Sequence, residues 1–244
     1  MSLLQLKHIC KSFSGVYANE NINLSVEKGE IHALLGENGA GKTTTISLLS
    51  TLLLPTKGEI LIDGQKLTRN RPDLKRKISV ITQEYSMRQD MNMDEIMEYQ
   101  GRLYFMPHKE IKRRTEELLE FCDLIKFRKR TVRKLSGGMK RKLMVCRALL
   151  TDPEILLLDE PTAGMDALSR RQMWNLLRKL NGKNLTILLT THYMEEAQNL
   201  CSRVALMDHG KLEEVNTPAG LIDSLGNYTV DEFAGDETHS HYFH

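Results

Sequence analysis

The sequence is poor in cysteine and has no apolar run long enough to cross a bilayer. Its four cysteines, Cys10, Cys122, Cys146 and Cys201, are scattered, and no two of them form a Cys-x-x-Cys pair. This spacing disfavours disulfides and metal sites and predicts a reduced, cytosolic chain. A membrane-spanning helix needs about 20 apolar residues, and the first residues lack the layout of a signal peptide. We therefore expect a soluble or peripheral protein.

The overall composition is that of an ordinary globular protein, but its charge is uneven. The chain has 244 residues, of which 41% are hydrophobic and 27% charged, and this length allows one large or two modest domains. The net charge is +2, yet residues 109–147 hold fourteen Lys and Arg against five Asp and Glu. A basic region can face a membrane, a nucleic acid or a partner protein, or can simply be a solvated helical surface.

Short strands are predicted before residue 85 and again after residue 150. Strand-forming runs occur at 3–10, 21–26, 30–35, 59–62 and 78–82. The later runs at 155–158 and 185–189 are apolar at nearly every position, as is typical of a parallel sheet covered on both faces. Between the two groups, strand signals disappear and apolar residues recur at helical spacing, which predicts a helical insert.

Two further features complete the predicted elements. Asp166 is suited to cap a helix that ends near residue 180, and strands at 203–207 and 211–215 flank a hairpin turn. After residue 218 the sequence is weakly patterned. Its last residues include His239, His241 and His244, for which a frayed end is a better interpretation than a metal site.

A glycine-rich loop is the most informative feature. Residues 36–43 fit the pattern G-x-x-x-x-G-K-[ST], and they lie between an apolar run and a helix-like run at 44–53. The glycines let successive N–H groups point inward, and the start of a helix adds partial positive charge, so the loop is suited to bind phosphates. Lys42 is expected to reach the β- and γ-phosphates and Thr43 to ligate Mg²⁺. The predicted nucleotide-binding residues of this loop are Gly36, Asn38, Gly39, Ala40, Gly41, Lys42, Thr43 and Thr44.

Two other motifs point to the same chemistry. The apolar run at 155–158 delivers Asp159 and Glu160 to the end of a strand, where open α/β sheets place ligands. Asp159 is suited to hold Mg²⁺ and Glu160 to accept a proton from an attacking water. Ser136 can cap a helical run, with Gly137 and Gly138 exposing backbone donors. Alone, this second motif fits a plain capped helix equally well, but its place between the phosphate loop and Asp159 favours a second anion site.

Together these motifs resemble the ATP-binding subunit of ABC transporters. The matches are the phosphate loop, the signature Leu135-Ser136-Gly137-Gly138 and the stretch Leu158-Asp159-Glu160-Pro161-Thr162. Smaller matches agree in position with the family's adenine-stacking aromatic, its Q-loop glutamine, its D-loop and its switch histidine; they are Phe13, Gln83, Gly164-Met165-Asp166 and His192. The resemblance covers roughly residues 3–217.

The resemblance implies hydrolysis of ATP with Mg²⁺. Glu160 would polarise the attacking water, and His192 would orient Glu160 and hold the γ-phosphate. The expected catalytic residues are Glu160, His192, Lys42 and Gln83, and the expected metal site is Thr43, Gln83 and Asp159. Phe13, where the family usually has Tyr, would stack on adenine. Ser136, Gly137 and Gly138 would bind the γ-phosphate held by a second copy of the chain, or by a homologous subunit, in a head-to-tail dimer.

The implied fold is α/β. It has a P-loop (RecA-like) parallel-sheet core, an N-terminal antiparallel β subdomain and an inserted α-helical subdomain. Residues 1–217 would form one ATPase domain, with the core at 1–85 and 150–217 and the insert at about 86–149, followed by a C-terminal tail at 218–244.

The resemblance also implies a partner. A separate membrane permease would dock near residues 84–102, which places the chain peripherally on the cytoplasmic face of the cell membrane. Residues 41–45, residues 193–197 and the short insert resemble the branch of drug, antibiotic and sodium exporters, the ABC-2 type.

The main alternative is a related ATPase that acts on nucleic acid or on the ribosome. Chromosome-organising relatives separate the two halves of the site with long coiled coils, and no heptads occur here. Ribosome-acting relatives usually carry two cassettes in one chain, and this chain has one, so no nucleic-acid partner is expected. A regulatory nucleotide sensor would require a failed catalytic set, whereas Glu160 and His192 are both present.

Overall fold

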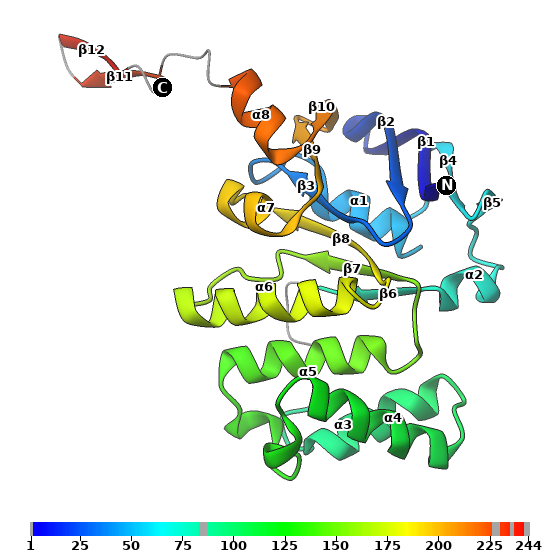
Figure 1. Cartoon of the computed structure of the whole chain (residues 1–244). Coiled ribbons are helices and arrows are strands. Elements are labelled where there is room, and N and C mark those ends of the chain that lie inside the picture. Colours follow the sequence, from blue (N-terminus) through cyan, green and yellow to red (C-terminus); the bar gives the residue numbers. More distant parts are fainter. Residues whose placement is uncertain (1, 83–86, 226–229, 235–236, 242–244) are drawn as a thin grey trace.

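A six-stranded sheet forms the centre of the molecule. The computed structural model describes residues 2–82, 87–225, 230–234 and 237–241. The strand order of this sheet is β10-β9-β3-β8-β7-β6, in which only β10 runs antiparallel to its neighbour (Figure 1). Its strands are β3 (Ile31–Leu35), β6 (Ile78–Ile81), β7 (Ile155–Asp159), β8 (Thr186–Thr191), β9 (Arg203–Asp208) and β10 (Lys211–Asn216).

The central strands are buried on both sides, as their apolar runs predict. Every residue of β7 and β8 is buried. Successive side chains of a strand point to opposite faces, so Leu156 and Leu158 pack into one apolar cluster and Ile155 and Leu157 into another. Covering both faces keeps this parallel sheet out of water.

One face of the central sheet is covered by a second, antiparallel sheet and by the helix that follows the phosphate loop. The antiparallel sheet has the order β2-β1-β4-β5, which confirms the predicted N-terminal β subdomain. Side chains of both, such as Leu4 and Leu49, share an apolar cluster with Leu34 and Leu188 of the central sheet. The elements are β1 (Ser2–Phe13), β2 (Val16–Glu27), α1 (Lys42–Leu49), β4 (Lys57–Ile62) and β5 (Gln65–Lys66).

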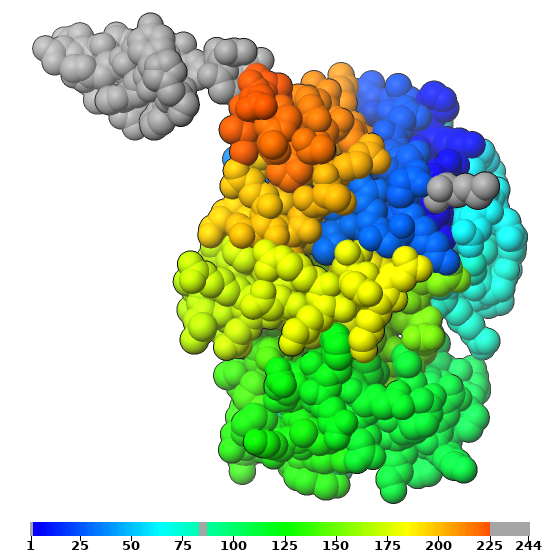
Figure 2. Space-filling model, in the orientation of Figure 1, coloured from blue at the N-terminus to red at the C-terminus, as the bar shows by residue number. Residues whose placement is uncertain are grey.

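Helices cover the opposite face of the central sheet. Those that lie between β6 and β7 in the sequence form a separate lobe (Figures 1 and 2). A capping box between Asn92 and Glu95 begins the first of its helices. Buried side chains such as Met97, Leu119 and Leu143 hold the lobe together. Its helices are α3 (Met93–Leu103), α4 (His108–Phe121) and α5 (Gly137–Leu149), with 3₁₀ turns at Ile125–Phe127 and Val132–Lys134. The division into a core and an insert at about 86–149 stays a prediction, which this arrangement supports.

Two helix starts follow the capping chemistry that the sequence indicates. The Ser136 hydroxyl accepts the N–H of Met139 at 3.3 Å at the start of α5. At the start of α6 (Ala167–Asn181), the Asp166 carboxylate accepts the N–H of Ser169 at 2.9 Å. The hydroxyl and N–H of Ser169 hold the pKa of the Asp166 carboxyl below its usual range. Each cap satisfies a backbone donor that the helix itself leaves unpaired.

Five short helices and strands lie where the sequence predicts none. A helix, α2 (Pro72–Arg76), interrupts the region of predicted strands, and α7 (Met194–Leu200) follows His192. The expected unpatterned tail begins with α8 (Pro218–Leu225), where Leu221 is fully buried against the main core. Beyond it, β11 (Val230–Ala234) pairs with β12 (Glu237–His241). Elements this short depend on tertiary packing rather than on their own propensity. Of residues 239–244, for which the sequence predicts a frayed end, 239–241 lie in β12 instead, and 242–244 lie outside the described residues.

Two expectations about membranes and redox state can be compared with the structure. Within the described ranges, no helix combines the length and apolar content that crossing a membrane requires. All four cysteines are free thiols. Burial raises the pKa of the Cys146 and Cys201 thiols, which favours the protonated thiol over the nucleophilic thiolate.

Candidate nucleotide-hydrolysis site

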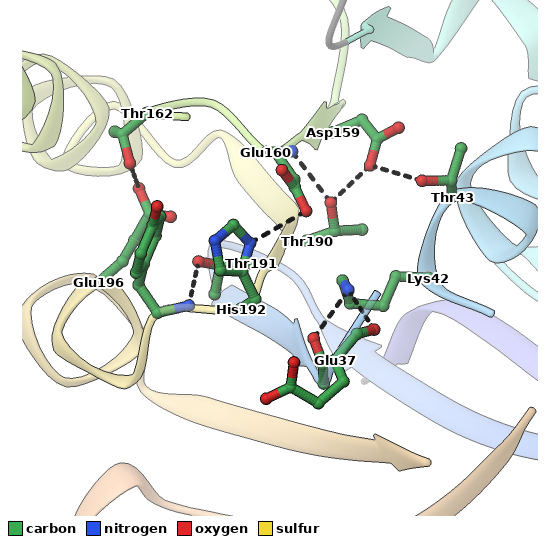
Figure 3. Close-up of polar contacts among 12 residues, drawn as sticks. Glu37, Lys42, Thr43, Asp159, Glu160, Thr162, Thr190, Thr191, His192 and Glu196 are labelled. Atoms are coloured by element: carbon green, nitrogen blue, oxygen red, sulfur yellow. Dashed lines mark hydrogen bonds and ion pairs between the residues drawn. The ribbon is translucent and has the colours of Figure 1, made fainter. Parts of the chain in front are cut away.

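The predicted site residues gather at the carboxyl ends of three neighbouring parallel strands. The phosphate loop leaves β3, Asp159 ends β7, and His192 follows β8 (Figure 3). Because β3 and β7 both pair in parallel with β8, these ends meet at one edge of the sheet. Open α/β sheets bind their ligands at such an edge.

The backbone of the phosphate loop requires glycine. Gly39 and Gly41 have φ of 90° and 98°, which lies in the left-handed region that other residues adopt only at a cost. A side chain at Gly41 would come within 2.5 Å of the Ala18 carbonyl oxygen, and one at Gly36 within 2.2 Å of the Met207 carbonyl oxygen. The loop is therefore packed against neighbouring backbone and is held in its curled shape.

Lys42 is buried and turns back over this loop. Its ammonium donates to the carbonyl oxygens of Gly36 at 2.8 Å and Glu37 at 2.9 Å, and Figure 3 shows Lys42 turned toward Glu37. Lys42 is the first residue of α1, so its ammonium group lies close to the positive end of that helix. A phosphate oxygen is a better acceptor for this cation than a carbonyl oxygen, so the group fits an anionic ligand held by the loop.

Asp159 is the centre of a hydrogen-bond chain that joins the phosphate loop to the carboxyl ends of β7 and β8. Its Oδ1 accepts the Thr43 hydroxyl at 3.3 Å and the Thr190 hydroxyl at 2.6 Å. Thr190 Oγ1 in turn accepts the N–H of Glu160 at 3.0 Å. Asp159 is buried, and Thr43 and Asp159 together offer the oxygen ligands that Mg²⁺ prefers. Their chemistry therefore fits the predicted metal.

Glu160 and His192 form a pair beside this chain. His192 Nδ1 lies 3.1 Å from Glu160 Oε1, and because a carboxylate can only accept, the imidazole donates from Nδ1. The Glu160 side chain is 12% exposed and that of His192 28%, so solvent reaches both groups. The φ of Glu160 is 45°, a conformation uncommon outside glycine, and such outliers cluster at active sites.

Two residues at this edge are not among the predicted site residues. Thr190 bridges Asp159 and Glu160, although the sequence offers it only as one of a run of strand residues. Glu196 of α7 is fully buried, and its Oε1 accepts the Thr162 hydroxyl at 2.8 Å and Trp174 Nε1 at 3.1 Å. It thereby joins the helix after His192 to the segment after Glu160 and to α6.

The remaining predicted residues lie elsewhere. Phe13 ends β1 with 47% of its surface exposed, and the Lys11 ammonium lies 4.9 Å from its ring centroid. The signature residues Ser136 and Gly137 are exposed at the start of α5, and Gly138 faces Ser169 of α6. Gln83 lies outside the described residues, so its predicted contact with Mg²⁺ stays a prediction.

The fold and the site define a P-loop nucleotide hydrolase. The sequence model of the family described as ABC transporter matches residues 19–163, which is more than half of the chain. The chain belongs to the ABC transporter family and is an ABC ATPase, as the motifs predict.

Characterised relatives cover nearly the whole chain. The Nod factor export ATP-binding protein I of Cupriavidus metallidurans is 37% identical, and the match spans 97% of this chain and 78% of that protein. The linearmycin resistance ATP-binding protein LnrL of Bacillus subtilis is 36% identical over 93% of this chain and 73% of its own length.

Solved structures show the same fold. The protein cbiO1 of Clostridium perfringens, described as part of the ABC transporter complex cbiONQ, superposes with a TM-score of 0.84 at 25% identity, and the match covers 91% of each chain. A dimeric ATP-binding cassette in a post-hydrolysis state, bound to ADP and Pi, has a TM-score of 0.78 at 28% identity. The match covers 88% of this chain and 98% of that one.

Thr190 gives a direct test of the hydrogen-bond chain. Thr190→Val keeps the shape of the side chain but removes the hydroxyl, which leaves the buried Asp159 carboxylate and the Glu160 N–H without that partner. We expect the free energy of unfolding to fall by about 1–3 kcal/mol, measured by chemical denaturation.

Thr190→Ser is the matched control, because it keeps the hydroxyl. Its free energy of unfolding should therefore stay close to that of the unchanged protein. Equal stability of Thr190→Val and the unchanged protein would show that the chain of hydrogen bonds contributes nothing.

Proposed function

We propose that this chain binds and hydrolyses ATP between two copies of itself and so powers export of a substrate through a separate membrane permease. The observation that carries the proposal is the meeting of a curled phosphate loop, a buried Asp159 and the Glu160–His192 pair at one edge of the sheet. Each of these parts has a defined task in phosphoryl transfer to water.

ATP binding is assigned to the loop and to Phe13. Lys42 exchanges its carbonyl partners for β- and γ-phosphate oxygens, and the N–H groups of the loop and of the start of α1 hold the remaining oxygens. Phe13 offers an exposed ring on which adenine stacks. Asn38, Ala40 and Thr44 complete the loop's contacts with the nucleotide.

Hydrolysis is assigned to Glu160 and His192. Glu160 takes a proton from the attacking water as a general base, a role worth about 10²–10⁴ in rate. His192 holds the Glu160 carboxylate through Nδ1 and turns its other ring nitrogen toward the γ-phosphate. Thr43, Asp159 and Gln83 would hold Mg²⁺, which when bound offsets the negative charge of the phosphates.

The site becomes complete only with a second copy. Ser136, Gly137 and Gly138 expose the positive start of α5, a suitable partner for a γ-phosphate. The dimeric cassette with ADP and Pi among the structural relatives supports a head-to-tail pair. Closing on ATP and opening after hydrolysis would then supply the movement that drives transport.

Export and membrane location rest on the relatives. The names of two of them refer to Nod factor export and to linearmycin resistance, and cbiO1 belongs to a transporter complex. We therefore place this chain peripherally on the cytoplasmic face of the membrane, bound to a permease. The class of exported compound is a property of that permease and not of this fold.

A groove between the core and the helical lobe fits the permease. It has a volume of about 490 Å³ and includes residues of α1, α2, α3 and α5, where the cyan and green surfaces of Figure 2 meet. Leu52, Leu103 and Phe105 line it with 66%, 56% and 90% of their surfaces exposed. Exposed apolar side chains gathered in this way mark interaction sites, and Lys75 and Arg76 beside them favour an occupant with acidic residues. A cytosolic helix of the permease is the occupant we assign.

The basic region gives little support to a nucleic-acid function. Several of its cations are held in ion pairs within the chain, among them Arg113 with Glu117, Arg114 with Asp152 and Arg128 with Asp94. Cations engaged in this way are less available to phosphate groups of a nucleic acid.

Glu160→Gln tests the assignment of the base. The amide cannot accept the proton from water, so the turnover rate should fall by at least about 100-fold, while ATP affinity changes little. Steady-state phosphate release and nucleotide binding measure the two effects, and Glu213→Gln, an exposed acid on β10, is the control. A turnover rate close to that of the unchanged protein would refute the role of Glu160.

A mixing experiment tests the shared site. Ser136→Arg should bind ATP as a monomer yet not hydrolyse it. The arginine side chain is larger than serine and should block the contact of the signature with the nucleotide of the second copy. If the dimer is head-to-tail, a mixture of the two inactive variants, Ser136→Arg and Glu160→Gln, forms pairs with one intact site. Such a mixture should regain ATPase activity.

The mixture has two matched controls, namely each variant alone at the same total concentration. A mixture that stays as inactive as its components would contradict a site built from Glu160 of one copy and Ser136 of the other.

The docking groove predicts a variant that separates binding from catalysis. Leu103→Glu should weaken association with the permease by about tenfold or more, because it places a charge in the apolar contact. The ATPase rate of the isolated protein should stay the same. Co-purification with a permease that binds the unchanged chain measures the association, and Leu54→Glu, exposed outside the groove, is the control. If Leu103→Glu binds the permease as tightly as the unchanged protein does, the groove is not the docking site.

A further inference from the structure

Arg141 is a buried cation for which the sequence predicts no role. It lies on α5, five residues after the signature serine Ser136, and only 3% of its surface is exposed. Its guanidinium donates to three carbonyl oxygens, each at 3.0 Å: Nη1 to Thr82, Nη2 to Glu160 and Nε to Pro161.

These three carbonyls belong to two strand ends that are far apart in the sequence. Thr82 follows β6, and Glu160 and Pro161 follow β7. The two strands are parallel neighbours, so their carboxyl ends lie together at the catalytic edge. A planar guanidinium with donors in fixed directions can span both ends, whereas a lysine ammonium is a single point charge.

Arg141 completes the hold on the backbone of Glu160. The N–H of Glu160 is donated to Thr190, and its carbonyl accepts from Arg141. Between these two bonds the residue has a positive φ of 45°, a conformation that persists only where the surroundings enforce it. The direction of the Glu160 carboxylate toward His192 therefore depends on contacts that α5 and β8 supply.

We propose that Arg141 is a positioning residue for hydrolysis: it fixes the backbone of Glu160 relative to the signature helix α5 and to the end of β6. The inference rests on the proposed function, because it takes Glu160 as the general base. The signature and Arg141 lie on the same helix, α5. When the signature contacts the nucleotide of the second copy, any shift of α5 is passed through Arg141 to the backbone of Glu160 in the same chain. The same fork holds Thr82, the residue before the predicted Gln83.

Two variants of Arg141 separate geometry from charge. Arg141→Lys keeps the positive charge but loses the fork, and Arg141→Met loses both. Displacing the Glu160 carboxylate from the attacking water should slow hydrolysis without weakening ATP binding. We therefore expect kcat to fall about 10- to 100-fold in Arg141→Met, and less in Arg141→Lys. The KM for ATP should stay within about threefold, because the three hydrogen bonds of Arg141 described above go to the ends of β6 and β7, whereas the phosphates are assigned to Lys42 and the phosphate loop.

Lys142→Met is the matched control. Lys142 is the next residue of the same helix. Its Nζ lies 3.9 Å from Asp123 Oδ2, and it lines a pocket with residues of α6, whereas Arg141 contacts the ends of β6 and β7. It should keep kcat and KM within about twofold of the unchanged protein. The melting temperature of each variant is measured alongside, so that rates are compared between folded proteins. If Arg141→Met does not fold, the kcat of Arg141→Lys carries the test.

A double-mutant cycle with Glu160→Gln distinguishes positioning from a general structural role. If Arg141 acts through Glu160, Arg141→Met should lower the residual single-turnover rate of Glu160→Gln by less than about twofold. A further loss as large as that in the unchanged protein would overturn the proposal, and so would a normal kcat in folded Arg141→Lys and Arg141→Met while Glu160→Gln is inactive. Full activity of Glu160→Gln would instead overturn the proposed function itself.

Discussion

The structure of the site depends on the need to satisfy one buried carboxylate. Asp159 ends a strand that is buried on both faces, and a charge in that position is costly unless hydrogen bonds surround it. The hydroxyls of Thr43 and Thr190 supply those bonds, and each comes from a different element. Through them the phosphate loop, the strand before the switch histidine and the backbone of Glu160 are held at one edge of the sheet.

Other buried polar side chains extend this arrangement to the surrounding helices. Arg141 joins the signature helix to the strand ends of β6 and β7, and Glu196 joins the helix after His192 to Thr162 and Trp174. Each cross-link ties together segments that are far apart in the sequence. Under the proposed function, these bonds join the signature helix to the backbone of the proposed base within one chain.

The sequence predicts those features that local chemistry determines. Continuous apolar runs predict β7 and β8, glycine spacing predicts the phosphate loop, and capping residues predict the starts of α5 and α6. It does not predict Thr190, Arg141 or Glu196 as site residues, because their roles arise from contacts between segments about 20 to 60 positions apart. The helices α2, α7 and α8 were missed for a related reason, since packing on the core stabilises them more than their own residues do.

The central claim is that one complete site requires two copies of the chain. The most direct measurement is the ATPase rate per chain as a function of protein concentration, at saturating ATP and Mg²⁺, down to concentrations at which sedimentation shows only monomer. The account predicts that the rate per chain falls toward zero as the dimer dissociates. A rate per chain that stays constant into the monomeric range would contradict it, because each copy would then hold a complete site of its own.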